Sequence, residues 1–315
     1  MSMHKRILLP AALLLCAAMA APAQANFIVG IGEQNGHIFS DARFQQTNVK
    51  RIRYLVPIDW YKSKGQSAEV DGFMALAQAT GADVLVHFTA RRGCYVRGRY
   101  SRSKKCRLPT VRAYTSAFKR FHTRFPAVKT FGVWNEANHV SQPTAKNPRR
   151  AAQYFLAARK ACRTCTIVAA DVLDQRSMSS WVRKFLRNAK GKARIFGLHN
   201  YVDVNRRRTS GTRELLRLVP GQVWLTETGG ILTFLPAFRK NERRQARATK
   251  YMFSLAGKYD SRRRGLRSRI TRLYNYKWYG ESRRARFDAG LVSKNGAKPR
   301  KALAQFKKGA ARHKK

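Results

Sequence analysis

Acidic residues are scarce in this sequence. Only 16 of its 315 residues are Asp or Glu, against 65 Lys and Arg, and the formal net charge is +49. A surface with this balance attracts anionic polymers and surfaces, but it says little about the fold. Hydrophobic residues make up 44% of the chain, so a large core can still be built.

Long apolar runs are missing from the chain after its first residues. The single run, Ile7 to Ala20, follows two basic residues and precedes Ala23-Gln24-Ala25, the small-x-small pattern of a signal-peptidase site. The run is too short for a membrane span. We therefore predict that residues 1–25 are a signal peptide and that the mature protein is secreted. A lipid anchor through Cys16 is the alternative.

Cysteines are few. Apart from Cys16, which lies within the predicted signal peptide, the chain has Cys94, Cys106, Cys162 and Cys165. An even number in an exported protein favours two disulfides. Three pairings are open, and the local pairs 94–106 and 162–165 are the simplest. A four-cysteine zinc site is the alternative.

Eight short apolar segments, each rich in β-branched residues, are predicted to be strands. They are Phe27–Gly32, Arg51–Pro57, Asp83–Phe88, Thr130–Asn135, Thr166–Ala170, Ile195–Tyr201, Val223–Glu227 and Leu273–Trp278. Most are nearly continuous apolar runs, as expected of parallel strands that are buried on both faces.

Amphipathic segments lie between the predicted strands. Thr110 to Phe125 carries apolar residues at spacings of three and four and ends at Pro126, which predicts a helix. Three further segments have the same pattern, and Asp41 is expected to cap a short helix. They are Val70–Thr80, Arg149–Ala161 and Glu242–Leu255.

Strands that alternate with helices predict a single (β/α)8 TIM barrel over residues 26–306. The chain from 307 to 315 is expected to be a basic tail without structure. An open doubly wound sheet is the alternative, but it needs a glycine-rich phosphate turn after the first strand. The segment from Gly30 to Asn35 lacks the last glycine of that turn.

Two glutamates end predicted strands, and the ends of barrel strands are where reactive side chains lie. The fourth strand ends in Trp134-Asn135-Glu136 and the seventh in Thr226-Glu227-Thr228-Gly229. Two carboxyl groups at one barrel mouth suit glycosidic cleavage, because one donates a proton to the leaving oxygen while the other attacks the anomeric carbon.

These motifs resemble those of the clan A retaining glycoside hydrolases, in the neighbourhood of families 5 and 39. The resemblance covers most of the mature chain. It implies that Glu136 is the general acid/base, that Glu227 is the nucleophile and that Asn135 binds the sugar 2-hydroxyl. We then expect ionised Glu227 to raise the pKa of Glu136 by like-charge repulsion.

The resemblance also implies roles for side chains on other strands. Arg53 would keep Glu227 ionised, Tyr201 would hydrogen-bond it, and Trp278 would form the floor of the −1 subsite. His87 and His199 would contact the sugar or the carboxylates. No tight cluster of His, Asp and Glu occurs at metal-ligand spacing, so we expect no metal and no cofactor.

Basic residues crowd three loops that leave the predicted barrel mouth. They follow the third, sixth and eighth strands, at Arg91 to Arg107, Arg206 to Arg208 and Arg283 to Arg286. This pattern suggests an anionic poly- or oligosaccharide substrate, or electrostatic association with a cell wall or membrane surface. The alternative is that the whole protein is simply cationic, since residues 262–269 are basic as well.

Other functional classes fit the sequence less well. A barrel that binds glycan or cell wall without cleaving it remains the alternative function, and a transglycosylase would share the same glutamates. A nucleic-acid binder is not indicated, because no recognisable nucleic-acid-binding module is present. We expect a monomer.

Overall fold

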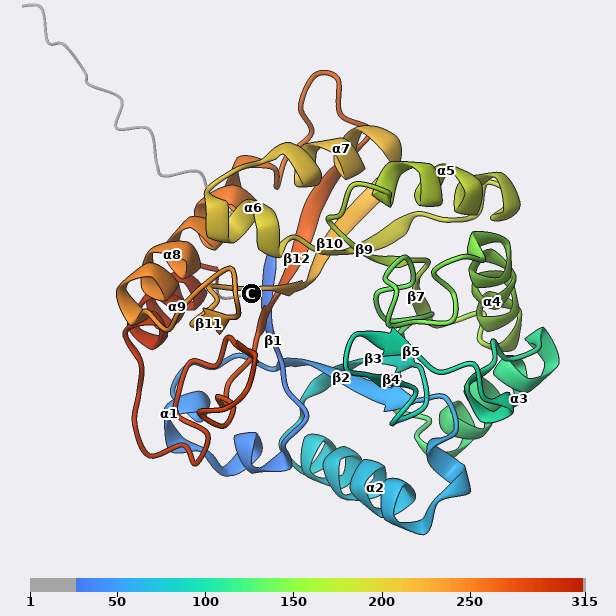
Figure 1. Ribbon diagram of the computed structural model, residues 1–315, viewed down its shortest axis with the longest axis horizontal. Coiled ribbons are helices and arrows are strands. Elements are labelled where there is room, and N and C mark those ends of the chain that lie inside the picture. Colours follow the sequence, from blue (N-terminus) through green and yellow to red (C-terminus); the bar gives the residue numbers. More distant parts are fainter. Residues whose placement is uncertain (1–26, 314–315) are drawn as a thin grey trace, which may run out of the picture.

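Nine parallel strands form the central sheet of residues 27–313, the part of the chain that the computed structural model describes (Figure 1). In the sheet they follow the order β7-β6-β3-β2-β1-β12-β10-β9-β8. Their bounds are β1 Ile28–Gly32, β2 Arg51–Pro57, β3 Asp83–Thr89, β6 Thr130–Gly132, β7 Thr166–Val168, β8 Asp171–Leu173, β9 Ile195–His199, β10 Gly221–Thr228 and β12 Ser268–Tyr276.

The two outer strands of that order, β7 and β8, are halves of one barrel strand. Only Ala169 and Ala170 separate them. Across this gap the Ala169 nitrogen donates to Ile195 O at 2.8 Å, and the Gly197 nitrogen donates to Ala170 O at 2.7 Å. When β7 and β8 are counted as one strand, the sheet has eight strands, and it closes into a barrel because this strand pairs with β9. The predicted TIM barrel is confirmed.

Three strands end earlier than predicted. The strand β6 stops at Gly132, although the Asn135 nitrogen still donates to Phe88 O of β3 at 2.7 Å. The strand β9 stops at His199, and Tyr201 instead begins a helix. The strand β12 stops at Tyr276, two residues before Trp278. In each case the chain turns away from the barrel at its mouth, the end at which the carboxyl ends of the strands meet.

Helices surround the barrel (Figure 1). Their bounds are α1 Ala42–Gln45, α2 Lys64–Ala79, α3 Val111–Arg124, α4 Pro148–Ala161, α5 Met178–Asn188, α6 Tyr201–Arg206, α7 Ser210–Leu218, α8 Glu242–Lys258 and α9 Lys301–Ala311. The predicted cap is present, since the Asp41 carboxylate accepts from the Arg43 nitrogen at 2.9 Å. No helix within residues 27–313 is both long and apolar enough to cross a bilayer.

The last helix corrects the expectation for the C-terminal tail. The helix α9 continues to Ala311, so residues 307–311 are helical. They are ordered because Phe306 and Ala310 are buried, with the Phe306 ring 6.2 Å from that of Phe253 on α8. The predicted signal peptide lies outside the described residues.

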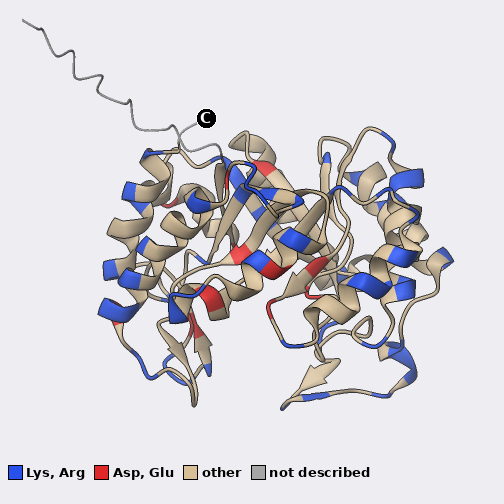
Figure 2. Cartoon of the chain, turned by 90° about the horizontal axis from the view of Figure 1, so that it is seen from above, with Lys and Arg blue, Asp and Glu red and all other residues tan. Residues whose placement is uncertain are grey.

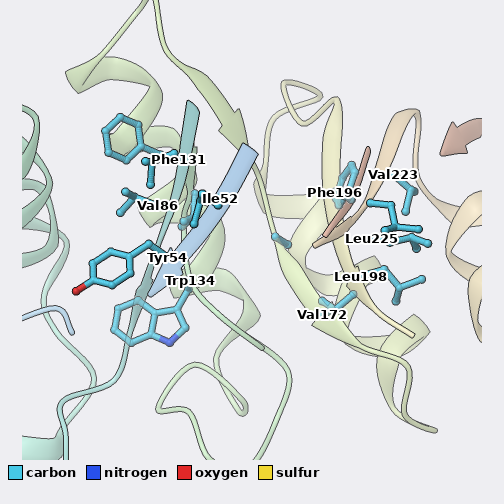
Figure 3. Packing of buried hydrophobic residues seen from close by; sticks show 14 of the residues in the cluster. Ile52, Tyr54, Val86, Phe131, Trp134, Val172, Phe196, Leu198, Val223 and Leu225 are labelled. Atoms are coloured by element: carbon cyan, nitrogen blue, oxygen red, sulfur yellow. The ribbon is translucent and has the colours of Figure 1, made fainter. Parts of the chain in front are cut away.

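Buried side chains fill the space between the barrel and its helices. Figure 3 shows one group around Ile52, Val86 and Phe131 and a second group that includes Phe196 and Leu225. These residues face outward from neighbouring strands toward the helices, which explains why the outer face of the strands is apolar.

An aromatic stack holds the segment that leads into Glu136. The ring of Tyr154 lies 4.3 Å from that of Tyr114 and 5.5 Å from that of Trp134. Trp134 also donates from Nε1 to Gln142 Oε1 at 2.9 Å. The residue two positions before Glu136 is thus fixed in the core.

Two small antiparallel ribbons stand at the barrel mouth. One is the hairpin of β4 (Tyr95–Val96) and β5 (Arg99–Tyr100), and the other pairs β11 (Thr233–Phe234) with β13 (Phe287–Asp288). They lie on opposite sides of the mouth in Figure 1 and project from the same face in Figure 2.

Both predicted disulfides are present. Cys94 is bonded to Cys106 across the base of the β4–β5 hairpin, and Cys162 is bonded to Cys165 after α4. With the cysteines paired in this way, a four-cysteine zinc site is not formed.

We expect the loss of the Cys94–Cys106 bond to be the more destabilising of the two. Because it closes the longer loop, the double variant C94S/C106S should lower the free energy of unfolding by about 3 kcal/mol, and C162S/C165S by about 2 kcal/mol. Urea denaturation of the oxidised proteins measures both. A larger loss from the short loop would contradict this expectation.

Candidate active site

The structure brings the two predicted glutamates together. Glu136 lies in the loop after β6 and Glu227 near the end of β10. One oxygen of each carboxyl group and a ring nitrogen of His199 all lie within 4.8 Å of one another. The Glu136 side chain is 21% exposed and that of Glu227 is 12% exposed, so both face the mouth from a largely buried position.

Arg53 of β2 lies beside Glu227 and is almost completely buried. Its Nη1 donates to Glu227 Oε2 at 2.7 Å. Its Nη2 donates to Asn135 Oδ1 at 2.5 Å and to Asp171 Oδ2 at 3.0 Å. A buried guanidinium is stable only where anions and acceptors surround it, so these contacts fix the acceptors as well as the arginine.

His199 lies between the two glutamates and is fully buried. Its Nε2 is 2.9 Å from Asp171 Oδ2, and its Nδ1 is 3.2 Å from Glu136 Oε1. Burial lowers the pKa of His199, but the negative charges of Asp171 and Glu227 and the two hydrogen bonds outweigh burial and raise it to about 10. His199 is therefore an imidazolium at neutral pH and donates from both nitrogens.

The pKa of Glu136 departs from the sequence-based expectation. Burial raises it, but the hydrogen bond and positive charge of His199 outweigh burial, and the pKa lies below its ordinary value. The expectation of a raised pKa was wrong because it considered Glu227 and omitted the cation between the two carboxyl groups. His139, whose Nδ1 is 3.7 Å from Glu136 Oε2, adds to the same effect.

The backbone at Glu136 is in the left-handed region, with φ of 44°. Residues with side chains rarely adopt this conformation, which costs ~1–3 kcal/mol and persists only where surrounding contacts impose it. Here the Ala137 nitrogen donates to Asp171 O at 2.8 Å, and the Asn138 amide exchanges hydrogen bonds with the Leu173 backbone. The loop that carries Glu136 is thus anchored to β8.

Asp171, the first residue of β8, is the central residue that the sequence analysis missed. Its buried carboxylate accepts hydrogen bonds from Arg53, His199 and Thr226. Burial raises its pKa, but the charges of His199 and Arg53 hold the pKa far below its ordinary value. The strand-end rule, applied to the fifth strand as it was to the fourth and seventh, points to this residue.

Close packing leaves no room for side chains at two positions in this layer. A Cβ atom at Gly197 would lie 2.0 Å from Asp171 Oδ1, and one at Gly132 would lie 1.8 Å from His87 Nε2. Glycine is required at both positions because buried polar side chains of the site occupy the space.

His87 supports Arg53 from below. It is fully buried, and its Nδ1 accepts from Arg53 Nε at 3.2 Å. Burial lowers the pKa of His87 to about 3, so the ring is neutral and carries its hydrogen on Nε2, 3.4 Å from Asp171 Oδ2. His87 therefore lies behind the predicted sugar site and does not line it.

Tyr201 reaches the site although it begins α6 instead of ending a strand. Its hydroxyl donates to Glu227 Oε1 at 3.0 Å. Together with Arg53 it gives each oxygen of Glu227 a donor. The contact agrees with the prediction from the sequence, but Tyr201 begins a helix and does not end a strand.

Trp278 does not form an open floor for a sugar, contrary to the prediction. It is completely buried, packs edge-on against Phe44 and donates from Nε1 to Asp41 Oδ2 at 3.0 Å. Tyr276, two residues earlier and the last residue of β12, is partly exposed, and its pKa is raised by burial and by the charge of Glu227.

Glu136, His199 and Glu227 are also the group at the mouth whose spacing could suit a metal ion. Their chemistry does not suit one. Both ring nitrogens of protonated His199 are donors, and Glu227 already accepts from Arg53 and Tyr201. These residues fit proton transfer and carboxylate chemistry better than cation binding.

Comparison with known proteins yields similarity in structure only. No protein-family model and no curated protein matches the sequence. A psychrophilic glycoside hydrolase family 10 endo-beta-1,4-xylanase is 14% identical, with a TM-score of 0.62 over 90% of this chain and 96% of that chain. The enzyme GH5_18 from Streptomyces cattleya, solved in complex with GlcNAc, is 13% identical, with a TM-score of 0.61 over 92% and 81%.

A family 39 glycoside hydrolase from Bacteroides cellulosilyticus WH2 is 14% identical, with a TM-score of 0.55 over 90% of this chain and 63% of that chain. The protein shares the TIM-barrel fold of these glycoside hydrolases. At these identities the likeness establishes the fold, so the chemistry has to be argued from the site.

The raised pKa of His199 makes the stability of the fold depend on pH. His199 binds its proton more tightly when folded, with a pKa of about 10 against 6.5, so its contribution to the free energy of unfolding is complete below pH 6.5 and is lost as pH rises to about 10. Urea denaturation at several pH values should show that the free energy of unfolding falls more steeply across this pH window in the wild type than in His199→Gln. Equal slopes would contradict this assignment.

Asp171→Asn tests whether Asp171 keeps His199 protonated. The variant removes a charge 2.9 Å from His199 Nε2, so the pKa of His199, followed by NMR of the imidazole nitrogens, should fall toward its ordinary value. Thr226→Val is the control, because it removes a hydrogen bond to Asp171 but leaves the charge in place. An unchanged pKa in the asparagine variant would rule out this role.

Proposed function

We propose that this protein is a secreted retaining glycoside hydrolase that cleaves O-glycosidic bonds of a poly- or oligosaccharide. The observation that carries the proposal is the spacing of Glu136 and Glu227, whose oxygens approach within 4.8 Å. Carboxyl groups about 5–5.5 Å apart leave no room for a water between carboxylate and sugar. That spacing supports double displacement through a glycosyl-enzyme.

Glu227 is the nucleophile in this proposal. Arg53 and Tyr201 each donate to one of its oxygens, which orients the carboxylate for attack. Attack on the anomeric carbon forms an ester between Glu227 and the sugar and breaks the bond to the leaving oxygen.

Glu136 is the general acid and then the general base. In the free protein the proton lies on His199 Nδ1, 3.2 Å from Glu136 Oε1. As the ester forms, Glu227 loses the negative charge that helps to raise the pKa of His199, with Nδ1 only 3.7 Å from Oε2. In the same step the proton passes through Glu136 to the leaving oxygen as the bond from that oxygen to the sugar breaks. In the second step Glu136 takes a proton from the attacking water, whose oxygen bonds to the anomeric carbon and releases the Glu227 carboxylate.

Asn135 is suited to bind a hydroxyl of the sugar next to the scissile bond. Its Oδ1 accepts from Arg53, which leaves the amide nitrogen as the group that can donate. An amide held in this orientation would bind an acceptor oxygen of the sugar without having to reorganise.

Secretion is supported by the chemistry of the cysteines. Disulfides persist in oxidising compartments, and both cysteine pairs are bonded. We propose that the predicted signal peptide directs this export and that the substrate is met outside the cytoplasm.

Glu227→Gln tests the proposal. Because it removes the nucleophile and leaves the shape intact, it should reduce reducing-sugar release from a responding polysaccharide by about a thousandfold or more, while Glu136→Ala should regain rate on an activated aryl glycoside when azide is added. Glu281→Gln is the matched control, since that carboxylate pairs with Lys277 at the same face.

The assay should use a panel of neutral and acidic polysaccharides, because the sugar is to be identified. Full activity in Glu227→Gln would refute the mechanism. No release by the wild type from any member of the panel, with wild type and Glu227→Gln sedimenting equally with insoluble wall, would favour a barrel that binds glycan without cleaving it.

A further inference from the structure

The β4–β5 hairpin has a built and fixed shape. Its two-residue turn has φ of 49° at Arg97 and 83° at Gly98, the sign pattern of a turn that matches strand twist. The Cys94–Cys106 bond closes its base, and the Tyr100 hydroxyl donates to Cys106 O at 2.8 Å. Such a closed element can present side chains at the mouth without first having to order itself.

The hairpin reaches the loop that carries Glu136. The ring of Tyr95 lies edge-on to that of His139 with centroids 6.3 Å apart, and His139 Nδ1 is 3.7 Å from Glu136 Oε2. In a retaining mechanism the general acid protonates the leaving oxygen. The hairpin therefore lies on the side of the leaving group.

Exposed apolar side chains mark this hairpin. Tyr95 is 40% exposed and Val96 is 56% exposed. The other ribbon at the mouth also exposes an aromatic and an aliphatic residue, Phe234 and Leu235. A partly open aromatic ring offers a flat apolar surface and a polar edge, which suits the face of a sugar ring.

Cations without a carboxylate partner surround these apolar side chains. At the base of the hairpin, Arg91 pairs with Asp59 and Arg92 pairs with Glu69. Beyond them, the basic residues of the hairpin and of the segment that follows it as far as Arg107 are called the hairpin cations, and none has a carboxylate oxygen within 4.0 Å in residues 27–313. These exposed cations are Arg97, Arg99, Arg102, Lys104, Lys105 and Arg107.

Charge alone does not distinguish the hairpin, because Lys and Arg cover the whole molecule (Figure 2). A hollow of about 330 Å³ at the amino ends of β7 and β9 is also basic, with Arg163, Lys192 and Arg194 among its residues. That hollow lacks the exposed apolar side chains found at the mouth, and it lies at the opposite end of the barrel from Glu136.

We propose that the β4–β5 hairpin is a binding subsite for an anionic glycan on the leaving-group side. Tyr95 packs on a sugar ring, and Arg99, Arg102 and Lys104 contact its carboxylate or phosphate groups. The side assigned to the leaving group depends on the proposed hydrolase function, whereas binding by the hairpin can be measured without cleavage.

The test compares binding by two triple variants that remove the same charge. One is R99Q/R102Q/K104Q on the hairpin, and the other is R163Q/K192Q/R194Q at the far end of the barrel. Probes are a galacturonate octasaccharide, its methyl-esterified form and poly(glycerol phosphate), titrated by calorimetry at 0.15 M salt. At this ionic strength the screening length is about 8 Å, which suppresses long-range attraction.

We expect the hairpin variant to bind the galacturonate or the phosphate probe about tenfold more weakly, because each partly screened contact contributes about a two- to threefold factor in affinity. The far-end variant should bind the same probe as tightly as the wild type does. The probe whose affinity changes shows whether the hairpin recognises carboxylate or phosphate groups. Tyr95→Ala should weaken binding of the methyl-esterified probe too, if that probe binds, because the stacking is independent of charge.

Equal losses in the two triple variants would overturn the proposal and assign the attraction to general charge. It would also fail if neither the galacturonate nor the poly(glycerol phosphate) probe bound while vesicles with phosphatidylglycerol bound the wild type and not the hairpin variant. If the wild type hydrolysed no polysaccharide in any assay but still bound an anionic probe through the hairpin, the hydrolase function would be refuted and the binding subsite would stand.

Discussion

The guanidinium of Arg53 is buried under the barrel mouth, and the site is arranged around the need to neutralise it. A buried cation is tolerated only with anions and hydrogen-bond acceptors in contact. Asp171, Glu227, Asn135 and His87 meet that need from four other strands or strand ends. Because one planar group contacts all four, their relative positions are set together.

The balance of charge within the site explains how its groups share protons. Two cations, Arg53 and His199, face three carboxyl groups, those of Asp171, Glu136 and Glu227. Asp171 stays ionised in this surround, and its charge helps to hold the proton on His199. Conversion of Glu227 to a sugar ester would leave two cations and two carboxyl groups. The chemistry that we propose therefore moves the site toward balance and makes the His199 proton easier to release.

The outer surface follows a different electrostatic rule. Inside the mouth each cation is paired, whereas the hairpin cations outside it point into solvent without a carboxylate partner among the described residues. A screened surface charge contributes little to stability, so these residues are available for binding. The disulfide at the base holds them near Glu136, which connects the unusual composition of the chain to the position of its candidate site.

Much of the fold could be predicted from the sequence because the strands are short, nearly continuous apolar segments and local patterns mark their ends. The rule that reactive side chains lie at the ends of barrel strands located Glu136 and Glu227. The short separations between cysteines along the sequence indicated both disulfides. Three features could not be predicted in this way: Trp278 is buried, Tyr201 begins a helix, and α9 continues to Ala311. They depend on where the chain bends and on what it packs against there, which local patterns do not encode. The protonation states of Asp171, His199 and Glu136 were decided by tertiary structure alone, because a pKa depends on charges brought within a few ångströms from distant strands.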